Sequence, residues 1–550
     1  MSVSARSDCS LPVWLAVPCV PLRCVGASDL PSQESHERLE SGEPLHRTPW
    51  RLWGSGLPRP QVGITDPAPH RCGHLEEQCP TGIEYGGSVV DVLVAERTKS
   101  RAPEAIRAKL RLSTFAGVLA GAVFGYAAGV IAAAGLQLTS QFNLTAVWMS
   151  IVASALLLGA LIGASVVSRL ERRYSTRALL AAAATIAGVG ALLSAVVPAG
   201  AVGVLIATRV LIGFGVGIIS VSAPRYLSET SPSAVRGSRV ATFQLMICVG
   251  FLASYVSGLA FAGSDGWRFM FALTAIPCVV LVALLSRATN TPTDLYRSGR
   301  HEELTQVVSA LEPDRDASSA TAELVASLDS PQLSWGEVVS AKRRRVLVLG
   351  LVFAVGQILT GINAIMYFAP QIFSDAGFTS ATAAIVATII VGVVNVLATF
   401  VAIRYIDRFG RRPLLIVGLT IMVASGLTIA LVSMTMGTGG VAGYITLVAV
   451  LLFVASFAMS MGPVTWVLIG ELFPPEMRDK AMSLALSANW GTNLVLSLAF
   501  LPLMQIVGTG AVFGCFAVIN FALLVFVLRK LPETRGLTLT EIGALTASSK

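Results

Sequence analysis

Twelve apolar runs follow one another along this sequence from Leu112 onward, and each is long enough to cross a lipid bilayer as an α-helix. A helix needs about 20 consecutive apolar residues to span the hydrocarbon core. Of the 550 residues, 54% are hydrophobic and only 13% are charged, so charged side chains are too few to cover a soluble protein of this size. The sequence therefore predicts an all-α membrane protein. We place its spans at 112–134, 147–168, 178–200, 201–224, 240–263, 269–286, 346–370, 381–403, 413–436, 441–470, 481–505 and 510–528.

Basic residues lie in alternate loops between these spans, and this pattern predicts the orientation of the chain. The formal net charge of +8 is by itself compatible with binding to nucleic acid. However, the Arg and Lys residues cluster after the even-numbered spans, whereas the opposite loops hold little more than Asp265, Arg268 and Asp375. Cytoplasmic loops of membrane proteins carry an excess of Lys and Arg. We therefore predict a multi-pass protein of the plasma membrane, in contact with the lipid bilayer and not with nucleic acid, with both termini in the cytoplasm.

The first 95 residues differ from the rest of the chain. They contain five of the eight Cys and four of the five His residues, and no apolar run suited to a span or a folded core. We interpret 1–95 as a disordered tail or as sequence translated upstream of a later true start. His70, Cys72, His74 and Cys79 are of the types that bind zinc. The tail is the favoured interpretation, and we expect no metal or other cofactor.

The twelve spans divide into two sets of six around a polar segment, and the two sets share a sequence signature. The same acidic, proline and basic spacing follows the fourth and the tenth span, as Glu229, Pro232 and Arg236 and as Glu471, Pro474 and Arg478. A duplicated six-helix unit is typical of transporters that bind their substrate between the halves, and it argues against a channel. We divide the chain into an N-terminal bundle at 96–287, a linker with short helices at 288–345, a C-terminal bundle at 346–530 and a tail at 531–550.

Six motifs then carry a resemblance to a known family. They are RVLIGFGVGIISVSAPRYLSETSPSAVRG (209–237), GQILTGINAIMYFAPQIF (356–373), IDRFGRRPLL (406–415), GPVTWVLIGELFPPEMRDKAM (462–482), NWGTN (489–493) and PETRGLTLTEI (532–542). Together they resemble the sugar porter family of the major facilitator superfamily over about residues 110–545. The resemblance implies twelve transmembrane helices in two six-helix pseudo-repeats, and transport of a sugar or polyol by alternating access, for which no oligomer is required.

Neutral amide side chains inside the spans are the candidate binding groups. Sugar hydroxyls donate and accept hydrogen bonds, as amides do, and aromatic rings cover the C–H face of a sugar. The spans contain Gln244, Gln357, Asn363, Asn395, Asn489 and Asn493, with Trp466 and Trp490 nearby. Any one of them could simply bond two helices together, but a set spread over facing helices favours binding. The resemblance implies sugar contacts for all of these amides except Asn489, ring packing for Trp466, and an external gate at Tyr367 and Phe368.

The sequence departs from the family pattern at positions that bear on the substrate. Ile358 stands where the family usually has a second Gln, Thr465 replaces the second Pro of a GPxPW motif, and Ala458 stands where animal glucose facilitators have Glu. A pentose, another hexose and a polyol such as inositol therefore all stay open. Gly361 permits a helix break between Gln357 and Asn363, and the Gly462–Pro463 pair permits another in the tenth span; the alternative for the Pro is a kink used only for packing.

Charged residues at the inner helix ends are predicted to form a lock that closes one face of the transporter. Alternating access needs contacts that form and break, and exposed ion pairs of about 0–1 kcal/mol each are weak enough to do both. The alternative is that these residues only set topology, but the duplicated spacing favours a lock. The PTDL element (292–295) lacks the Glu and Arg of the usual PESPRWL, which predicts a looser N-terminal latch. The predicted lock comprises Glu229, Arg236, Asp407, Arg408, Gly410, Arg411, Glu471 and Arg478, with Glu171 and Arg412 beside them.

The driving force is predicted from what the spans lack. Proton symport needs a group that binds a proton within the transport path, usually Asp, Glu or His. The predicted spans contain none of these, and Arg209 is their only charged residue. In proton-coupled sugar porters an Asp of the first span pairs with this Arg, and the resemblance places Ala127 at that position. We therefore predict a facilitator, in which water, carbonyl groups or an anionic group satisfy Arg209.

Three other functions stay open. The first is a proton-coupled sugar symporter that uses a boundary carboxylate such as Glu229 or Glu471. The second is a non-transporting sugar sensor, against which the short tail after the last span argues. The third is a multidrug exporter, which would be expected to carry an acid in its cavity instead of amides. We predict no enzyme activity, because no nucleophile, base or metal cluster lies within the predicted spans.

Overall fold

The computed structural model describes residues 104–531, apart from 264, 329–332, 342, 379, 438 and 475. The predicted N-terminal extension, with its His and Cys residues, and the PETRGLTLTEI motif lie outside the described residues. Within the described part the chain forms α-helices, one short 3-10 helix and connecting turns, and no strand.

The N-terminal half contains six spans, and most of its helices are longer than the apolar runs predicted from the sequence. The sixth span consists of two helices joined at Thr274. The helices are α2 (Glu104–Phe142), α3 (Ala146–Leu170), α4 (Thr176–Ala195), α5 (Val202–Glu229), α6 (Arg236–Ala260), α7 (Gly266–Leu273) and α8 (Ala275–Arg287), with the 3-10 helix η1 (Ser233–Val235) before α6.

The linker forms four short helices, and the C-terminal half forms seven helices. The linker helices are α9 (Pro292–Arg297), α10 (His301–Leu311), α11 (Ala317–Leu328) and α12 (Trp335–Val338). The C-terminal helices are α13 (Arg344–Leu359), α14 (Ile362–Asp375), α15 (Ala381–Phe409), α16 (Arg411–Thr435), α17 (Gly440–Met459), α18 (Met461–Leu472) and α19 (Arg478–Lys530).

Eleven helices of the described part are long and apolar enough to cross a membrane, judged by length and composition. The last of them, α19, is 53 residues long and holds two predicted spans, because Gly508 interrupts it with φ 81° and ψ 156°. Pairs of shorter helices such as α13 and α14 together make one span. The predicted all-α fold with two six-helix pseudo-repeats is therefore confirmed.

Small residues let neighbouring helices approach closely within the N-terminal half. A Cβ atom on Gly125 of α2 would lie 1.9 Å from the carbonyl oxygen of Ile247 on α6. A Cβ atom on Gly213 of α5 would lie 1.9 Å from the carbonyl oxygen of Leu156 on α3. Membrane helices associate by such close packing, because lipid gives no hydrophobic drive for one helix to bury another.

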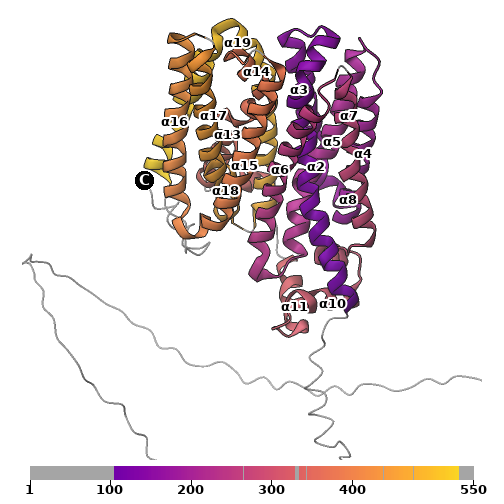
Figure 1. The fold of residues 1–550 in the computed structure, drawn as a ribbon. Coiled ribbons are helices and arrows are strands. Elements are labelled where there is room, and N and C mark those ends of the chain that lie inside the picture. The colour runs from indigo at the N-terminus through magenta and orange to yellow at the C-terminus, as the bar shows by residue number, and fades with distance from the viewer. Residues whose placement is uncertain are drawn as a thin grey trace, which may run out of the picture. The chain divides into compact units, whose positions relative to one another are not determined.

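The two halves stand side by side and meet along three pairs of helices (Figure 1). Helix α3 packs against α19, α6 against α15, and α2 against α14. One continuous apolar core includes residues from both halves. A second, smaller apolar cluster joins Leu110 at the start of α2 to Leu295 and Leu304 of the linker.

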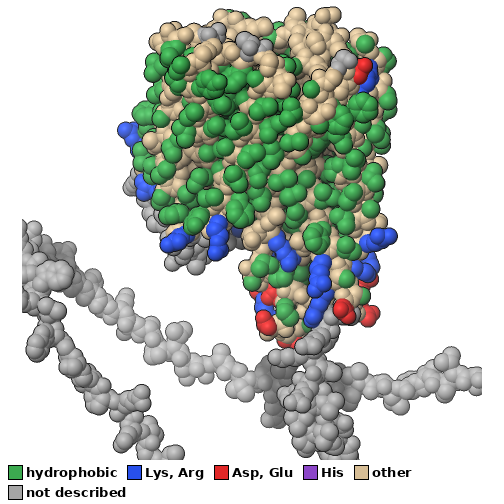
Figure 2. Space-filling model, in the orientation of Figure 1, with side chains coloured by type: hydrophobic (Ala, Val, Ile, Leu, Met, Phe, Trp, Pro, Cys, Tyr) green, Lys and Arg blue, Asp and Glu red, His purple; other side chains and the backbone are tan. Residues whose placement is uncertain are grey.

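The surface separates into an apolar band and a charged end. Figure 2 shows hydrophobic side chains over the sides of the bundle and Lys and Arg side chains gathered near the end that carries α10 and α11. This end is the one predicted from the loop charges to face the cytoplasm.

Replacing Gly213 by Ala is expected to destabilise the protein, because the new Cβ collides with backbone that cannot rotate away. Overpacking of this kind costs about 1–3 kcal/mol, so the melting temperature in detergent should fall by several degrees. The matched control is Gly203→Ala in the same helix, where no atom lies within 4 Å of the added Cβ. Equal melting temperatures for the two variants would contradict the described α3–α5 packing.

Candidate substrate-binding site

The seventh span is broken in its middle, and the break positions two of the predicted site residues. Helix α13 ends at Leu359 and α14 begins at Ile362. Between them Gly361 has φ +96°, a left-handed conformation that favours glycine. Gln357 lies in the last turn of α13, and Asn363, which is half-buried, lies in the first turn of α14. The predicted break at Gly361 is confirmed.

The tenth span is also broken, but earlier than the sequence predicts. Helix α17 ends at Met459 and α18 begins at Met461, and Ser460 between them has φ −126° and ψ −93°. The break therefore precedes the Gly462–Pro463 pair, which lies in the first turn of α18. Pro463 is tolerated there because the first N–H groups of a helix have no partner inside it.

The Gln357 amide connects the two breaks. Its Nε2 donates to the carbonyl oxygens of Met461 and Gly462, both at 3.1 Å. Its Oε1 accepts from Asn489 Nδ2 of α19 at 3.2 Å, and that nitrogen also donates to the Ala354 carbonyl oxygen at 2.7 Å. Both amide side chains are buried. In the described conformation they hold α13, α18 and α19 together.

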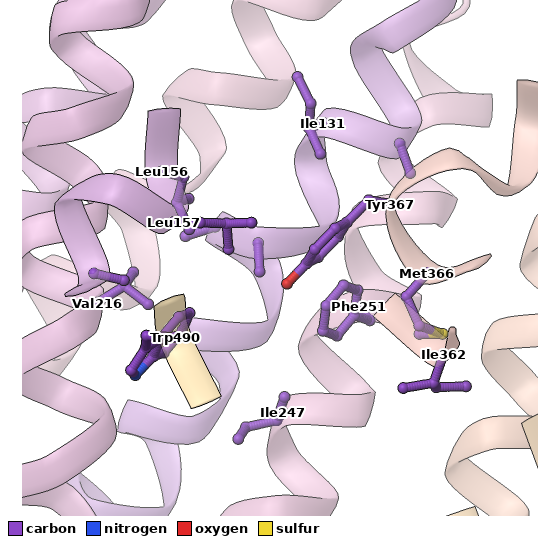
Figure 3. Packing of buried hydrophobic residues seen from close by; sticks show 14 of the residues in the cluster. Ile131, Leu156, Leu157, Val216, Ile247, Phe251, Ile362, Met366, Tyr367 and Trp490 are labelled. Atoms are coloured by element: carbon purple, nitrogen blue, oxygen red, sulfur yellow. The ribbon is translucent and has the colours of Figure 1, made fainter. Parts of the chain in front are cut away.

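Asn493 and Tyr367 form a second polar group. Asn493 Nδ2 donates to Tyr367 Oη at 3.2 Å, while its Oδ1 is buried without a hydrogen-bond partner among the described residues. The Tyr367 ring packs on Phe251 of α6, with 6.2 Å between ring centroids. Figure 3 shows the Tyr367 ring above Phe251 and below Ile131, two residues of the N-terminal half. Tyr367, a residue of the C-terminal half, therefore contacts the N-terminal half at the boundary between the two.

Gln244 and Asn395 lie on α6 and α15, two helices that pack together across the same boundary. The Cys248 thiol of α6 takes part in this packing, and its Sγ lies 3.4 Å from Thr399 Oγ1 of α15. Cys248 follows Gln244 by four residues, so the two share one face of α6. Sequence analysis did not single out Cys248, because a lone buried Cys usually serves packing.

The remaining predicted residues lie apart from these groups. Trp490 of α19 packs against Phe124 of α2, with 5.6 Å between ring centroids. Phe368 stacks on Phe500 at 5.4 Å, inside the C-terminal half, so it does not face the opposite half as Tyr367 does. Trp466 of α18 is half-buried.

Comparison with known proteins decides the family. The family described as "Sugar (and other) transporter" matches residues 113–545. The chain belongs to this family. It is 34% identical over 448 residues to the arabinose-proton symporter of Escherichia coli K12, an alignment that covers 80% of this chain and 94% of that relative. It is 35% identical over 439 residues to the D-xylose transporter of Levilactobacillus brevis, covering 78% of this chain and 94% of that relative.

A solved structure agrees with the family assignment. The xylose transporter XylE from E. coli, in a partially occluded inward-open conformation, matches with a TM-score of 0.69 and 29% sequence identity. The match covers 78% of this chain and 100% of that chain. The fold and the family agree with the expectation of a transporter and not an enzyme.

The transporter is closed where α14 meets the N-terminal half. Tyr255 of α6 donates to the carbonyl oxygen of Met366 at 2.7 Å. This carbonyl has no helix donor, because Pro370 four residues later lacks an N–H. Gly135 of α2 lies so close to Gln371 that an added Cβ would come within 2.8 Å of its Nε2. Toward the opposite end, α5 and α18 make no extensive contact within the described residues.

Arg209 is fully buried and is held by backbone carbonyl groups. Its Nε donates to the Val152 carbonyl oxygen at 2.8 Å, and its Nη2 lies 3.5 Å from that of Ala153. Its Cζ lies 5.7 Å from the ring centroid of Phe271, and Nη1 has no hydrogen-bond partner among the described residues. Ala127 is also buried, on α2, which packs against α5. Carbonyl groups satisfy the guanidinium in part, as predicted.

Ion pairs at the inner helix ends connect residues of the same half. Arg225 bonds Glu171 through Nη1 and Glu229 through Nε, both at 2.8 Å. Arg411 bonds Glu471 at 2.9 Å. Burial raises the pKa of Glu171, and the Arg225 guanidinium opposes this with a smaller effect. Sequence analysis counted Arg225 only among the basic residues that follow the even-numbered spans, since its double pairing depends on which way the ends of α3 and α5 face.

The other predicted lock residues are placed differently. Arg236 and Arg408 are exposed. Arg478 Nε donates to a backbone carbonyl oxygen at 3.2 Å. Gly410 has φ +86° and joins α15 directly to α16. The Asp407 side chain lies outside the described residues.

Asp294 in the PTDL element is a contact that sequence analysis missed. Its Oδ2 accepts from the backbone N–H of Thr176 at 2.8 Å, at the N-terminus of α4, where the helix dipole favours a carboxylate. Arg297 of the same short helix reaches the carbonyl oxygen of Glu171 at 3.4 Å. Helix α9 is thus attached to the N-terminal half without the usual Glu and Arg.

Replacing Gln357 by Ala is expected to raise the KM for the transported substrate about 5- to 100-fold. The variant removes the amide that is predicted to bond a substrate hydroxyl, and the loss of such a hydrogen bond costs about 1–3 kcal/mol of binding free energy. KM is measured by uptake into proteoliposomes. The control is Gln306→Ala on the linker helix α10, which should leave KM unchanged. An unchanged KM in folded Gln357→Ala protein would contradict a role in binding.

Proposed function

We propose that the transporter carries a neutral sugar or polyol across the plasma membrane by alternating access, as a facilitator. The observation that carries this proposal is the break at Gly361, beside which the Gln357 amide bonds the broken tenth span and Asn489. Two further candidate amides, Gln244 and Asn395, lie on α6 and α15, which pack against each other between the halves. Relatives named as arabinose, galactose and D-xylose transporters support a pentose or hexose as the substrate class.

The proposed binding residues act by exchanging hydrogen bonds. Gln357 and Asn489 bond each other and backbone carbonyl groups, so a sugar hydroxyl replaces one such bond as it enters. Asn493 Oδ1 lacks a described partner and is ready to accept from a hydroxyl. We assign substrate contacts to Gln244, Gln357, Asn363, Asn395, Asn489 and Asn493, with ring packing by Trp466 and Trp490.

Tyr367 and Phe368 are the proposed outer gate. The contact of Tyr367 with Phe251 and the hydrogen bond from Tyr255 to the Met366 carbonyl close this end in the described conformation. Phe368 contributes by anchoring the segment through Phe500. Opening outward then requires α14 to leave α2 and α6.

The proposed cytoplasmic lock forms when the opposite end closes. In the described conformation Arg225 and Arg411 pair within their own halves. One oxygen of Glu171 and one of Glu229 are buried without a partner among the described residues. Closure would bring the basic ends of α15 and α19 toward these acids. We propose that both termini lie in the cytoplasm. The basic side chains gathered at this end support this orientation (Figure 2).

Facilitation is proposed because the predicted spans contain no Asp, Glu or His, the residues that usually bind a proton in a transport path. Arg209 is held by carbonyl oxygens, and Ala127, which the family resemblance places at the position of the proton-carrying Asp, is buried. A proton symporter is the second candidate, since two of the relatives are named as symporters. The raised pKa of Glu171 makes it the boundary acid that such a mechanism would use.

Counterflow in proteoliposomes tests carrier function directly. Vesicles loaded with unlabelled D-xylose, L-arabinose, D-galactose, D-glucose or myo-inositol are diluted into a trace of the labelled compound. A carrier accumulates label transiently, because internal substrate competes with label for exit. A sugar sensor that binds without transport would show binding to the purified protein and no counterflow, and that result would overturn the proposal.

Replacing Ala127 by Asp is expected to make uptake pH dependent, because a carboxylate in the buried core near a guanidinium binds a proton over a shifted pH range. We expect a change of about threefold or more in KM between about pH 5 and pH 8, with Ala127→Asn behaving as the unmodified protein. The readout is initial uptake rate with equal pH on both sides of the membrane. A comparable pH dependence in the unmodified protein would contradict the assignment.

A further inference from the structure

Asn520 lies in the second half of α19, which corresponds to the last predicted span. Sequence analysis did not connect this span with the substrate. It is fully buried, and its neighbours on the same helix include Phe513, Phe516 and Leu523. A polar side chain inside a membrane helix is costly unless it has a partner and a use. Its contacts indicate what this use is.

The Asn520 amide is bonded to the end of a broken helix. Its Nδ2 donates to the carbonyl oxygen of Thr360 at 3.2 Å and to that of Phe516 at 2.9 Å. Thr360 caps α13, and a carbonyl group at a helix end has no helical donor. Asn520 supplies this donor in the described structure, inside a region where water is excluded.

The same turn of α19 also contacts the glycine at the break. A Cβ atom on Gly361 would lie 2.6 Å from the Phe516 ring, so ring and backbone are in direct contact. Phe516 and Asn520 are four residues apart and share one face of α19. The break in the seventh span is therefore held from one side by a ring and an amide of the twelfth span.

The bonded carbonyl is connected to the substrate-binding amides. Thr360 Oγ1 donates to the carbonyl oxygen of Gln357 at 2.6 Å. Gln357 in turn holds Asn489 and the carbonyl groups at the break of the tenth span. A change in the angle between α13 and α14 would move Gln357 and Asn363 relative to each other.

We propose that Asn520 is a positioning residue for the substrate site: it holds the Thr360 carbonyl and so sets the angle at which Gln357 and Asn363 face the substrate. It does not touch the substrate itself. The proposal rests on the proposed function for its binding readout, but its effect on the break does not depend on which substrate is carried.

The binding test compares Asn520→Leu, which keeps the volume and removes the donor, with Phe521→Leu, a change at the adjacent lipid-exposed position. Asn520→Leu is expected to raise KM in counterflow about tenfold with little change in maximal rate, whereas Phe521→Leu changes neither. Combination with Gln357→Ala should be non-additive, because both changes act on one network, and combination with Asn395→Ala should be additive. Additivity in both combinations, or an unchanged KM, would overturn the proposal.

Hydrogen–deuterium exchange separates this proposal from the proposed function. Asn520→Leu should accelerate exchange in peptides covering residues 356–366 and leave those of α16 unchanged. This result together with no counterflow by the unmodified protein would support Asn520 as the anchor of the break and refute sugar transport. Unchanged exchange at 356–366 would overturn the role of Asn520 whatever the transport result. If Asn520→Leu does not fold, Asn520→Ser, which keeps a shorter donor, is measured in the same way, with the same directions expected.

Discussion

The break in the seventh span is the constraint on which the rest of this site depends. Backbone groups released inside the hydrocarbon core find no water, so the protein must supply their partners. Asn520 bonds Thr360 at the inner side of the break, and Tyr255 bonds the Met366 carbonyl that Pro370 leaves open. One partner comes from the same half and the other from the opposite half. The broken span is thus fixed at one point and releasable at another.

The amides predicted to bind substrate also serve the empty protein. Gln357 satisfies two carbonyl groups beside the break of the tenth span and accepts from Asn489. Interhelical hydrogen bonds in membranes average only about 0.6 kcal/mol, so a hydroxyl that offers an equivalent bond can replace one at little cost. Under the proposed function, the structural and the binding interpretation of these residues, which sequence analysis treated as alternatives, describe two states of the same groups.

The spans and the break at Gly361 could be predicted because length, hydropathy and a single glycine determine them locally. Asn520 is an amide within the predicted span 510–528 and could have been included among the candidates by residue type alone, but its contact with Thr360 could not be predicted. Tyr255 and Asp294 were missed because their roles depend on which helix lies opposite and on the rotation of each helix about its axis. A run of apolar residues indicates neither the neighbouring helix nor the rotation of the helix about its axis. The break in the tenth span lies at Ser460, before the predicted Gly462–Pro463 pair. Proline is tolerated in the first turn of a helix, so the chain bends just before that turn. Phe368, predicted as a gate beside Tyr367, faces the C-terminal core because the backbone at this residue is not helical.

The buried guanidinium of Arg209 bears on whether a proton gradient drives transport. Among the described residues no carboxylate pairs with this guanidinium. Backbone carbonyl oxygens and an aromatic ring contact it instead. The most direct measurement is the steady-state ratio of internal to external sugar in proteoliposomes under an imposed inward proton gradient. The account predicts a ratio of one, reached at the same level with and without a protonophore. A ratio well above one that the protonophore collapses would contradict it.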